Sequence, residues 1–205
     1  MALRKDIPPE TEQAIASFDF TDLASGTGVE IFFGTASDSF NSTLDYHLVS
    51  TGDAKAGRAT TQRASAGTTV VEFETTEFNL QRTARGTAFL SASMGLNNTK
   101  GHITGEISII HADGGETIIA DKVSGQSVTI GATDTSEMMF IPLPLTETII
   151  KEGEKLRLSV DIFQASSGNM ELGHDPTGEA GSIIPLSTTT HTTKMQLLMP
   201  FKIET

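Results

Sequence analysis

The sequence of 205 residues contains no cysteine and no tryptophan, and Tyr46 is its single tyrosine. Without cysteine there can be no disulfide scaffold, no thiolate metal site and no cysteine nucleophile. The shortage of large aromatic side chains leaves little of the stacking surface on which proteins bind sugars or unstacked bases. These absences exclude several common classes of enzyme and binding site before any pattern is considered.

Positive charge is also scarce, with 14 Lys and Arg against 26 Asp and Glu and a formal net charge of −12. This balance repels phosphates at long range, so we expect no nucleic-acid partner. Long apolar runs are missing, because the longest, at 138–145, is interrupted by two prolines and falls short of the ~20 residues of a membrane helix. No apolar signal-peptide core follows Met1, so we expect no export signal and no membrane partner.

Threonine, with 29 residues, and glycine, with 19, are abundant. Threonine favours strands and glycine favours turns. Apolar residues fall on alternate positions over 155–163 and again near the end of the chain, which is the period of a strand with one buried face. The composition and the period together predict strands at 28–34, 42–49, 69–75, 86–94, 102–110, 116–120, 127–130, 137–145, 155–163 and 194–204.

Turn signals lie between these strands, and the clearest, Asp113-Gly114-Gly115, predicts a hairpin. Pro142 and Pro144 lie on one face of their strand, which predicts an edge strand or a bent one. The stretches 52–67 and 168–190 are expected to be long surface loops.

Eight to ten strands in a chain of this length predict an all-β fold, a single-domain, jelly-roll-like antiparallel β-sandwich. The sandwich is expected over residues 21–205. Residues 1–20 are expected to form an N-terminal arm or a short helix, since Pro9 suits the first position of a helix and an extended arm fits equally well.

The search for catalytic and metal-binding patterns is largely negative. The sequence has neither a Gly-x-Ser-x-Gly turn nor a phosphate-binding glycine loop. Its five histidines lack metal-site spacing, and Asp113 and Asp121 lack the pattern of a calcium loop. Glu72 and Glu74 alternate with apolar residues and are interpreted as a solvated strand face. We therefore expect no catalytic residue, no cofactor and no metal, and a protein that is not an enzyme.

One pair of residues, His174 and Asp175, is singled out as a candidate contact with a ligand or partner. The two side chains carry polar groups and lie in the glycine-flanked stretch 173–178. The alternative is a turn in which Asp175 hydrogen-bonds to the backbone ahead of Pro176.

Two stretches are similar to the late strands of galactose-binding-like jelly rolls. They read Ile-Pro-Leu-Pro-Leu at 141–145 and Lys-Glu-Gly-Glu-Lys-Leu-Arg-Leu-Ser-Val at 151–160, where a glycine turn leads into an alternating strand. This resemblance covers about a quarter of the chain and implies the same sandwich fold.

Over most of its length the chain resembles β-rich proteins encoded among the virion genes of marine tailed phages. The resemblance lies in the order of five segments, 30–34 (Glu-Ile-Phe-Phe-Gly), 73–80, 85–92, 173–176 (Gly-His-Asp-Pro) and 195–202. It implies a virion structural protein, first of all a capsid decoration (cement) protein that binds and stabilises the head.

The same resemblance leaves a neck or tail component as an alternative. It implies the major capsid protein or the neck and tail proteins as partners, a homo-oligomer, and assembly into the virion in the host cytoplasm. A carbohydrate- or receptor-binding β-sandwich module is the second hypothesis, because the fold permits it. An enzyme of unrecognised type is the third.

Overall fold

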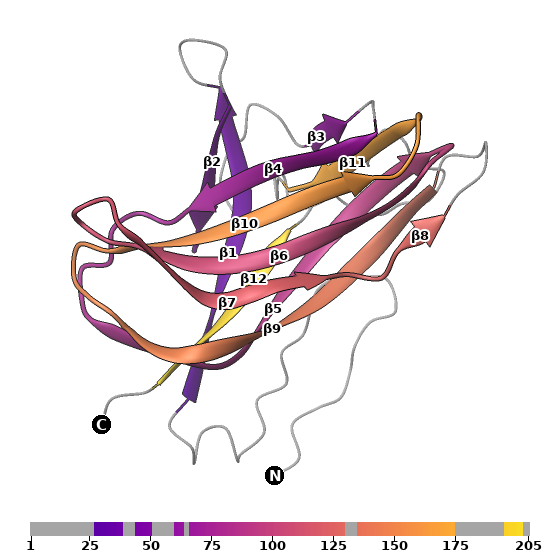
Figure 1. The fold of residues 1–205 in the computed structure, drawn as a ribbon. Coiled ribbons are helices and arrows are strands. Elements are labelled where there is room, and N and C mark those ends of the chain that lie inside the picture. The colour runs from indigo at the N-terminus through magenta and orange to yellow at the C-terminus, as the bar shows by residue number, and fades with distance from the viewer. Residues whose placement is uncertain are drawn as a thin grey trace.

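The computed structural model describes residues 27–38, 44–50, 60–63, 66–129, 135–174 and 195–202, and within these ranges the chain forms strands and no helix (Figure 1). The strands are β1 (Thr27–Asp38), β2 (Leu44–Val49), β3 (Thr60–Arg63), β4 (Gly67–Glu74), β5 (Arg82–Asn97), β6 (Lys100–Ile110), β7 (Glu116–Ser124), β8 (Val128–Thr129), β9 (Thr135–Ile150), β10 (Lys155–Gln164), β11 (Asn169–Gly173) and β12 (Gln196–Lys202). The all-β sandwich expected from the sequence is confirmed.

The hydrogen-bonded strands follow one continuous path, β3-β11-β5-β12-β1-β2-β4-β10-β6-β7, with β9 added to β5 and β8 added to β6. Every pairing is antiparallel except that of β2 with β4, which is parallel and consists of the single pair His47–Glu74. The path folds over at this weak contact. One layer therefore contains β4, β10, β6 and β7, and the other contains β2, β1, β12, β5 and β9 (Figure 1).

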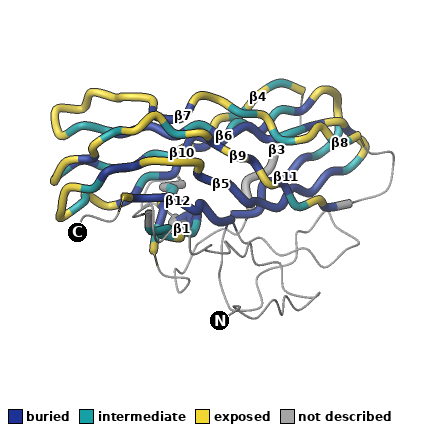
Figure 2. The backbone as a smooth tube through the Cα atoms, turned by 90° about the horizontal axis from the view of Figure 1, so that it is seen from below, coloured by how far each residue is buried: buried dark blue, intermediate teal, exposed yellow. Residues whose placement is uncertain are grey.

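The two layers face one another across a single apolar core. A Cβ placed on Gly105 of β6 would come within 3.1 Å of Leu90 on β5 and 3.3 Å of Leu143 on β9, so side chains of the second layer fill the space above this glycine. Figure 2 shows the buried residues gathered between the layers and the exposed ones at the hairpin ends. The longest strands, β5 and β9, thus supply one wall of the core.

The alternation of apolar residues decides the register of the central strands. Leu158 on β10 pairs with Phe73 on β4 and with Ile107 on β6, and all three side chains are fully buried. Because side chains alternate between faces, a slip of one residue would turn this row to the solvent. Arg157 and Ser159, on either side of Leu158, accordingly point to the outer face of the layer.

The hairpin predicted at Asp113-Gly114-Gly115 joins β6 to β7. Its Gly114 has φ +85°, which is open to glycine at no steric cost. The His111 amide donates to the Gly115 carbonyl and the Gly114 amide donates to the His111 carbonyl. The Gly115 amide donates to Oδ1 of Asp113 at 2.9 Å.

The strand with Pro142 and Pro144 is β9, which pairs with β5 alone among the described strands, so the edge position is confirmed.

Both long loops were predicted too long, because each contains a short strand. Residues Thr60–Arg63 within the stretch 52–67 form β3, and Asn169–Gly173 within 168–190 form β11, which pairs with β3 and with the end of β5. These segments lack a clear period-two pattern, so only the pairing of β11 with the long strand β5, and of β3 with β11, reveals them. Residues 52–59, 64–65 and 175–190 of these stretches, and the expected arm at 1–20, lie outside the described residues.

Candidate functional site

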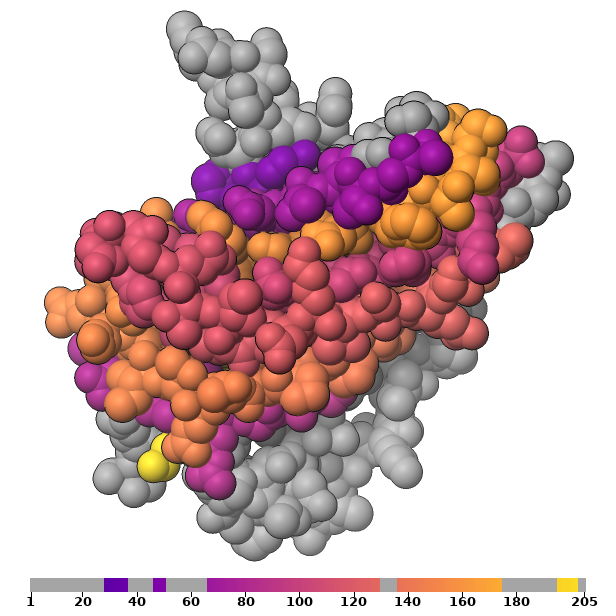
Figure 3. All heavy atoms as spheres, in the orientation of Figure 1, coloured from indigo at the N-terminus to yellow at the C-terminus, as the bar shows by residue number. Residues whose placement is uncertain are grey.

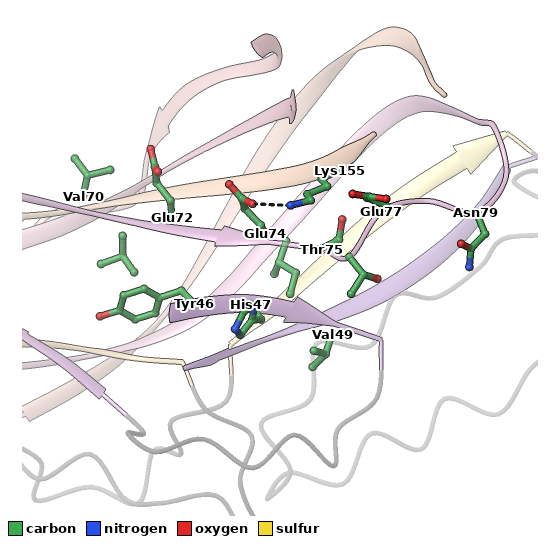
Figure 4. Close-up of a pocket in the computed structure, with 13 residues that line it drawn as sticks. Tyr46, His47, Val49, Val70, Glu72, Glu74, Thr75, Glu77, Asn79 and Lys155 are labelled. Atoms are coloured by element: carbon green, nitrogen blue, oxygen red, sulfur yellow. Dashed lines mark ion pairs between the residues drawn. The ribbon is translucent and has the colours of Figure 1, made fainter. Parts of the chain in front are cut away.

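A groove opens where the two layers join, between β2 and β4. It has a volume of about 1090 Å³ and is lined along β2 by residues 46–49 and along β4 and the segment after it by Val70–Glu72, Glu74–Glu77 and Asn79, with Lys155 of β10. Figure 4 shows Tyr46, His47 and Val49 on one side and Glu72 and Glu74 across from them. The groove exists because β2 and β4 form only one pair and then diverge.

The floor and the rim of the groove differ in chemistry, because side chains along β4 point alternately inward and outward. Val71 points inward and is buried, as is Leu48 on the opposite wall. Glu72 points outward, and its side chain is 51% exposed. The floor of the groove is therefore apolar, while its rim carries the carboxylates of Glu72, Glu74 and Glu77.

One cation organises this acidic rim. The Arg157 guanidinium donates to Oε1 of Glu74 at 2.6 and 3.0 Å and lies 3.6 Å from Glu72 and 3.4 Å from Glu116. Burial alone would raise the pKa of Glu74, but the hydrogen bonds and charge of Arg157, with Lys155 beyond, outweigh it and hold that pKa below its ordinary value. The Glu72 carboxylate lies 3.6 Å from the Arg157 guanidinium, farther than the Glu74 carboxylate, and its side chain is half exposed to solvent.

A second, smaller groove of about 550 Å³ continues past the end of β2. It shares Leu48, Val49 and Thr75–Glu77 with the first and ends at the ion pair of Arg82 with Glu30. The Arg82 guanidinium also lies over the rings of Phe78 and Phe201, 5.6 and 5.2 Å from their centroids. The two grooves form one depression along β2.

A different surface lies on the outer face of the second layer, where apolar residues line up across four strands. Pro142 of β9 pairs with Phe89 of β5, Phe89 pairs with Leu198 of β12, and Leu198 pairs with Ile31 of β1. Phe89 is 45% exposed and Ile31 37%, and Leu198 is buried between them. Phe140, 58% exposed, lies beside this row, which we call the outer apolar row.

The opposite outer face, of β4, β10, β6 and β7, is turned toward the viewer in Figure 3 and carries exposed charged residues beside the half-exposed Val70 and Ile118. Besides the Arg157 cluster it carries the ion pair of Lys122 with Asp161, whose Nζ and Oδ2 are 2.9 Å apart. Glu72 and Glu74, interpreted from the sequence as part of a solvated strand face, lie on this surface. The two faces of the sandwich thus differ in kind, one charged and one with an apolar row.

A hydroxyl, an imidazole and a carboxylate form a chain of hydrogen bonds at one end of the sandwich. His111 Nδ1 lies 2.7 Å from Oε1 of Glu154, and Nε2 lies 2.8 Å from Oγ1 of Thr117. With the proton on Nδ1, the ring donates to the carboxylate and accepts from the hydroxyl. Thr117 pairs with Ile109 in the ladder of β6 and β7, so the three residues tie two turns together, and we assign them a structural role.

Glu154 is the buried member of this network, 5% exposed. Burial alone would raise the pKa of Glu154, but hydrogen bonds from the Lys151 amide, at 2.7 Å, and from His111 outweigh it and hold that pKa below the ordinary value of 4.5. Sequence reasoning missed this site because β7, β8 and β9 separate Glu154 from His111, and no recognisable residue spacing connects the two.

His174, one of the two candidate contact residues, is fully buried. Its ring meets those of Tyr46 and Phe73 edge-on, with centroids 5.5 and 5.7 Å away. In the structure this side chain is part of the core rather than of an exposed loop. Asp175 lies outside the described residues, so the expectation that the pair contacts a ligand or partner stays a prediction.

No cluster of three or more His, Asp or Glu side chains suited to a metal occurs in the part of the chain that the structure describes. Within the same ranges there is no helix that is long and apolar enough to cross a bilayer.

Comparison with known proteins gives a likeness of fold alone. No family model and no curated protein matches the chain. The α-amino acid ester hydrolase labelled with selenomethionine is similar at a TM-score of 0.59 and 8% identity, over 84% of this chain and 36% of that one. A CocE/NonD family hydrolase from Staphylococcus aureus is similar at 0.51 and 10%, over 86% of this chain and 37% of that one.

The chain therefore spans little more than a third of the length of these hydrolases. At such identities the likeness shows a shared β-sandwich architecture and says nothing of hydrolase activity here. The structure of infectious bursal disease virus Gx strain aligns over the whole chain with 12% identity, but its TM-score of 0.29 is too low to carry an argument.

Proposed function

We propose that this chain is a non-enzymatic structural subunit of a virus particle, and that it acts as a decoration protein on the head of a tailed phage. The observation that carries the proposal is the outer apolar row, Pro142–Phe89–Leu198–Ile31, on one face of the sandwich. The order of sequence segments that resembles phage virion proteins supports the same assignment.

The physical reason is that aligned exposed apolar side chains weaken solubility unless a partner covers them. The core of a protein interface is apolar, and its rim is polar. The exposed members of the outer apolar row, with Phe140 beside them, offer such a core on β9, β5 and β1. The charged face of the other layer, with its excess of carboxylates, suits the outer surface of a particle, away from packaged DNA.

The test is co-sedimentation of the purified chain with purified heads and, separately, purified tails. We expect stoichiometric binding to heads. Replacing Phe89 and Phe140 together by Ser should abolish binding, because both side chains are about half exposed and their loss removes the apolar contact without opening the core. The matched control is Ile118→Ser, which removes a side chain of comparable exposure, 50%, from the charged face and should leave binding unchanged.

Binding to tails in place of heads would overturn the decoration role and favour the neck or tail alternative. A chain that ignores both assemblies, or a Phe89 and Phe140 variant that binds as well as wild type, would overturn the proposal that this row docks on the particle.

A further inference from the structure

The edge of β4 that faces β2 offers backbone groups as well as side chains. Within the described ranges the only ladder contact on this edge is the pair Glu74–His47, whereas the other edge pairs with β10 along its whole length. An open strand edge with a groove beside it can accept one further strand from another chain.

The hydrogen-bond pattern shows which residues offer those groups. The Thr75 amide donates to the Leu156 carbonyl at 2.9 Å, so Thr75 faces β10. Because backbone groups of successive residues in an antiparallel strand point to opposite edges, Phe73 and Val71 also face β10. Val70 and Glu72 therefore turn their N–H and C=O groups toward the groove.

The side chains around this edge specify what an added strand would contain. On one face it would meet Val71 and Leu48, which are buried in the floor. On the other it would lie beside Glu72, 51% exposed, and Glu77 on the rim. Since a strand alternates its side chains between faces, the complementary strand alternates apolar with basic residues.

We propose that the groove between β2 and β4 binds an extended segment of a partner protein in which basic and apolar residues alternate, and that this segment adds to β4 as a strand. A second copy of this chain is the less suitable occupant, because it carries a net charge of −12 and its own β4 edge would place Glu72 beside another acidic rim. The inference goes beyond the proposed function, since it concerns a different surface and another contact.

The experiment titrates the full chain with an end-blocked, fluorescently labelled peptide of the length of β4, 8 residues, in which Lys alternates with Val. Fluorescence anisotropy gives the Kd. We expect saturable one-to-one binding that weakens as salt is added, because the rim charges are exposed. A peptide with Glu in place of Lys should not bind. A Lys–Val peptide with two successive central residues replaced by Pro should bind at least about tenfold more weakly, because one of two successive backbone amides faces β4 whichever way the added strand runs, and proline removes that donor.

On the protein side, Glu72→Lys reverses a half-exposed charge of the groove and should weaken binding by about tenfold or more. The matched control is Glu137→Lys, which makes the same change at an exposed position on β9 and should bind as wild type. Val70→Pro removes one groove-facing amide without removing a bond to β10, and should weaken binding while circular dichroism still reports a folded sandwich.

Equal binding of the Lys–Val and proline peptides would overturn strand addition, and equal binding by the Glu72 and Glu137 variants would overturn the assignment of the groove. Self-association that Glu72→Lys alters, with no peptide binding, would assign the groove to a second copy instead. Glycan binding lost in Glu72→Lys, again with no peptide binding, would assign it to a sugar. The Phe89 and Phe140 variant should keep full peptide binding, so failure of this inference and of the proposed particle contact can be told apart.

Discussion

His111 and Glu154, 43 residues apart in the chain, are joined by a hydrogen bond of 2.7 Å between Nδ1 and Oε1. The same carboxylate accepts from the Lys151 amide, and the imidazole reaches Thr117 on its far side. The bond therefore links the turn after β6 to the turn before β10 and closes one end of the sandwich with polar groups that satisfy one another.

Replacing Glu154 by Ala should lower the free energy of unfolding by about 1–3 kcal/mol, because the Lys151 amide and His111 Nδ1 lose a buried acceptor. Urea unfolding followed by circular dichroism measures the change. Glu152→Ala, in the same turn but exposed, is the control and should change stability little. Equal effects of the two substitutions would show that the loss of stability comes from changing the turn and not from breaking the hydrogen-bonded network.

Stability should fall as the solution is acidified below about pH 4.5. The pKa values of Glu154 and Glu74 are both lower in the folded chain than the ordinary value of 4.5. The contribution of each carboxylate is thus complete above its unfolded pKa and is lost as pH falls through its folded pKa. Urea unfolding between about pH 7 and pH 3 should show the stability gap between wild type and Glu154→Ala closing with acid. A gap that stays constant would contradict the depressed pKa of Glu154.

Changing Leu158 to Asp should prevent folding. Loss of a buried leucine costs about 2–5 kcal/mol, and domains of this kind have only about 5–15 kcal/mol in total. The unpaired carboxylate, between Phe73 and Ile107, adds a further large penalty. Circular dichroism and thermal unfolding are the measurements. Ile118→Asp makes the same change at a half-exposed position of β7 and should stay folded.

Changing Gly168 to Ala should destabilise the fold by at least about 2 kcal/mol. Glycine adopts a φ of +138° freely, whereas alanine is strained there. An added Cβ would also lie 2.7 Å from the carbonyl oxygen of Asn98, and relieving that clash would require the backbone to move. Gly114→Ala is the comparison, since Gly114 has a positive φ with nothing within 4 Å of its Cβ, and should cost about 1 kcal/mol. Similar losses at both positions would show that strain alone acts at Gly168.

Period-two alternation and turn residues were enough to predict the fold class and all of the long strands. The row of Leu158 and the hairpin at Gly114 are decided by neighbours in the chain, because side-chain alternation and a positive φ are local properties. Short β11 has no comparable local signal. It is a strand because β5 is long enough to pair with β11 at one end and with β12 at the other.

The sites are products of the tertiary structure. Arg157 meets Glu74 across 83 residues, and the outer apolar row draws Ile31 and Pro142 to one face through two intervening strands. His174, the residue chosen from its glycine-flanked setting, is instead enclosed by Tyr46 and Phe73. The sequence by itself determined which residues alternate and where the chain turns. Which strands lie side by side, and hence which distant charges and apolar groups meet, is decided only by the tertiary structure. The physical reason is that such pairings depend on packing between segments that share no local signal.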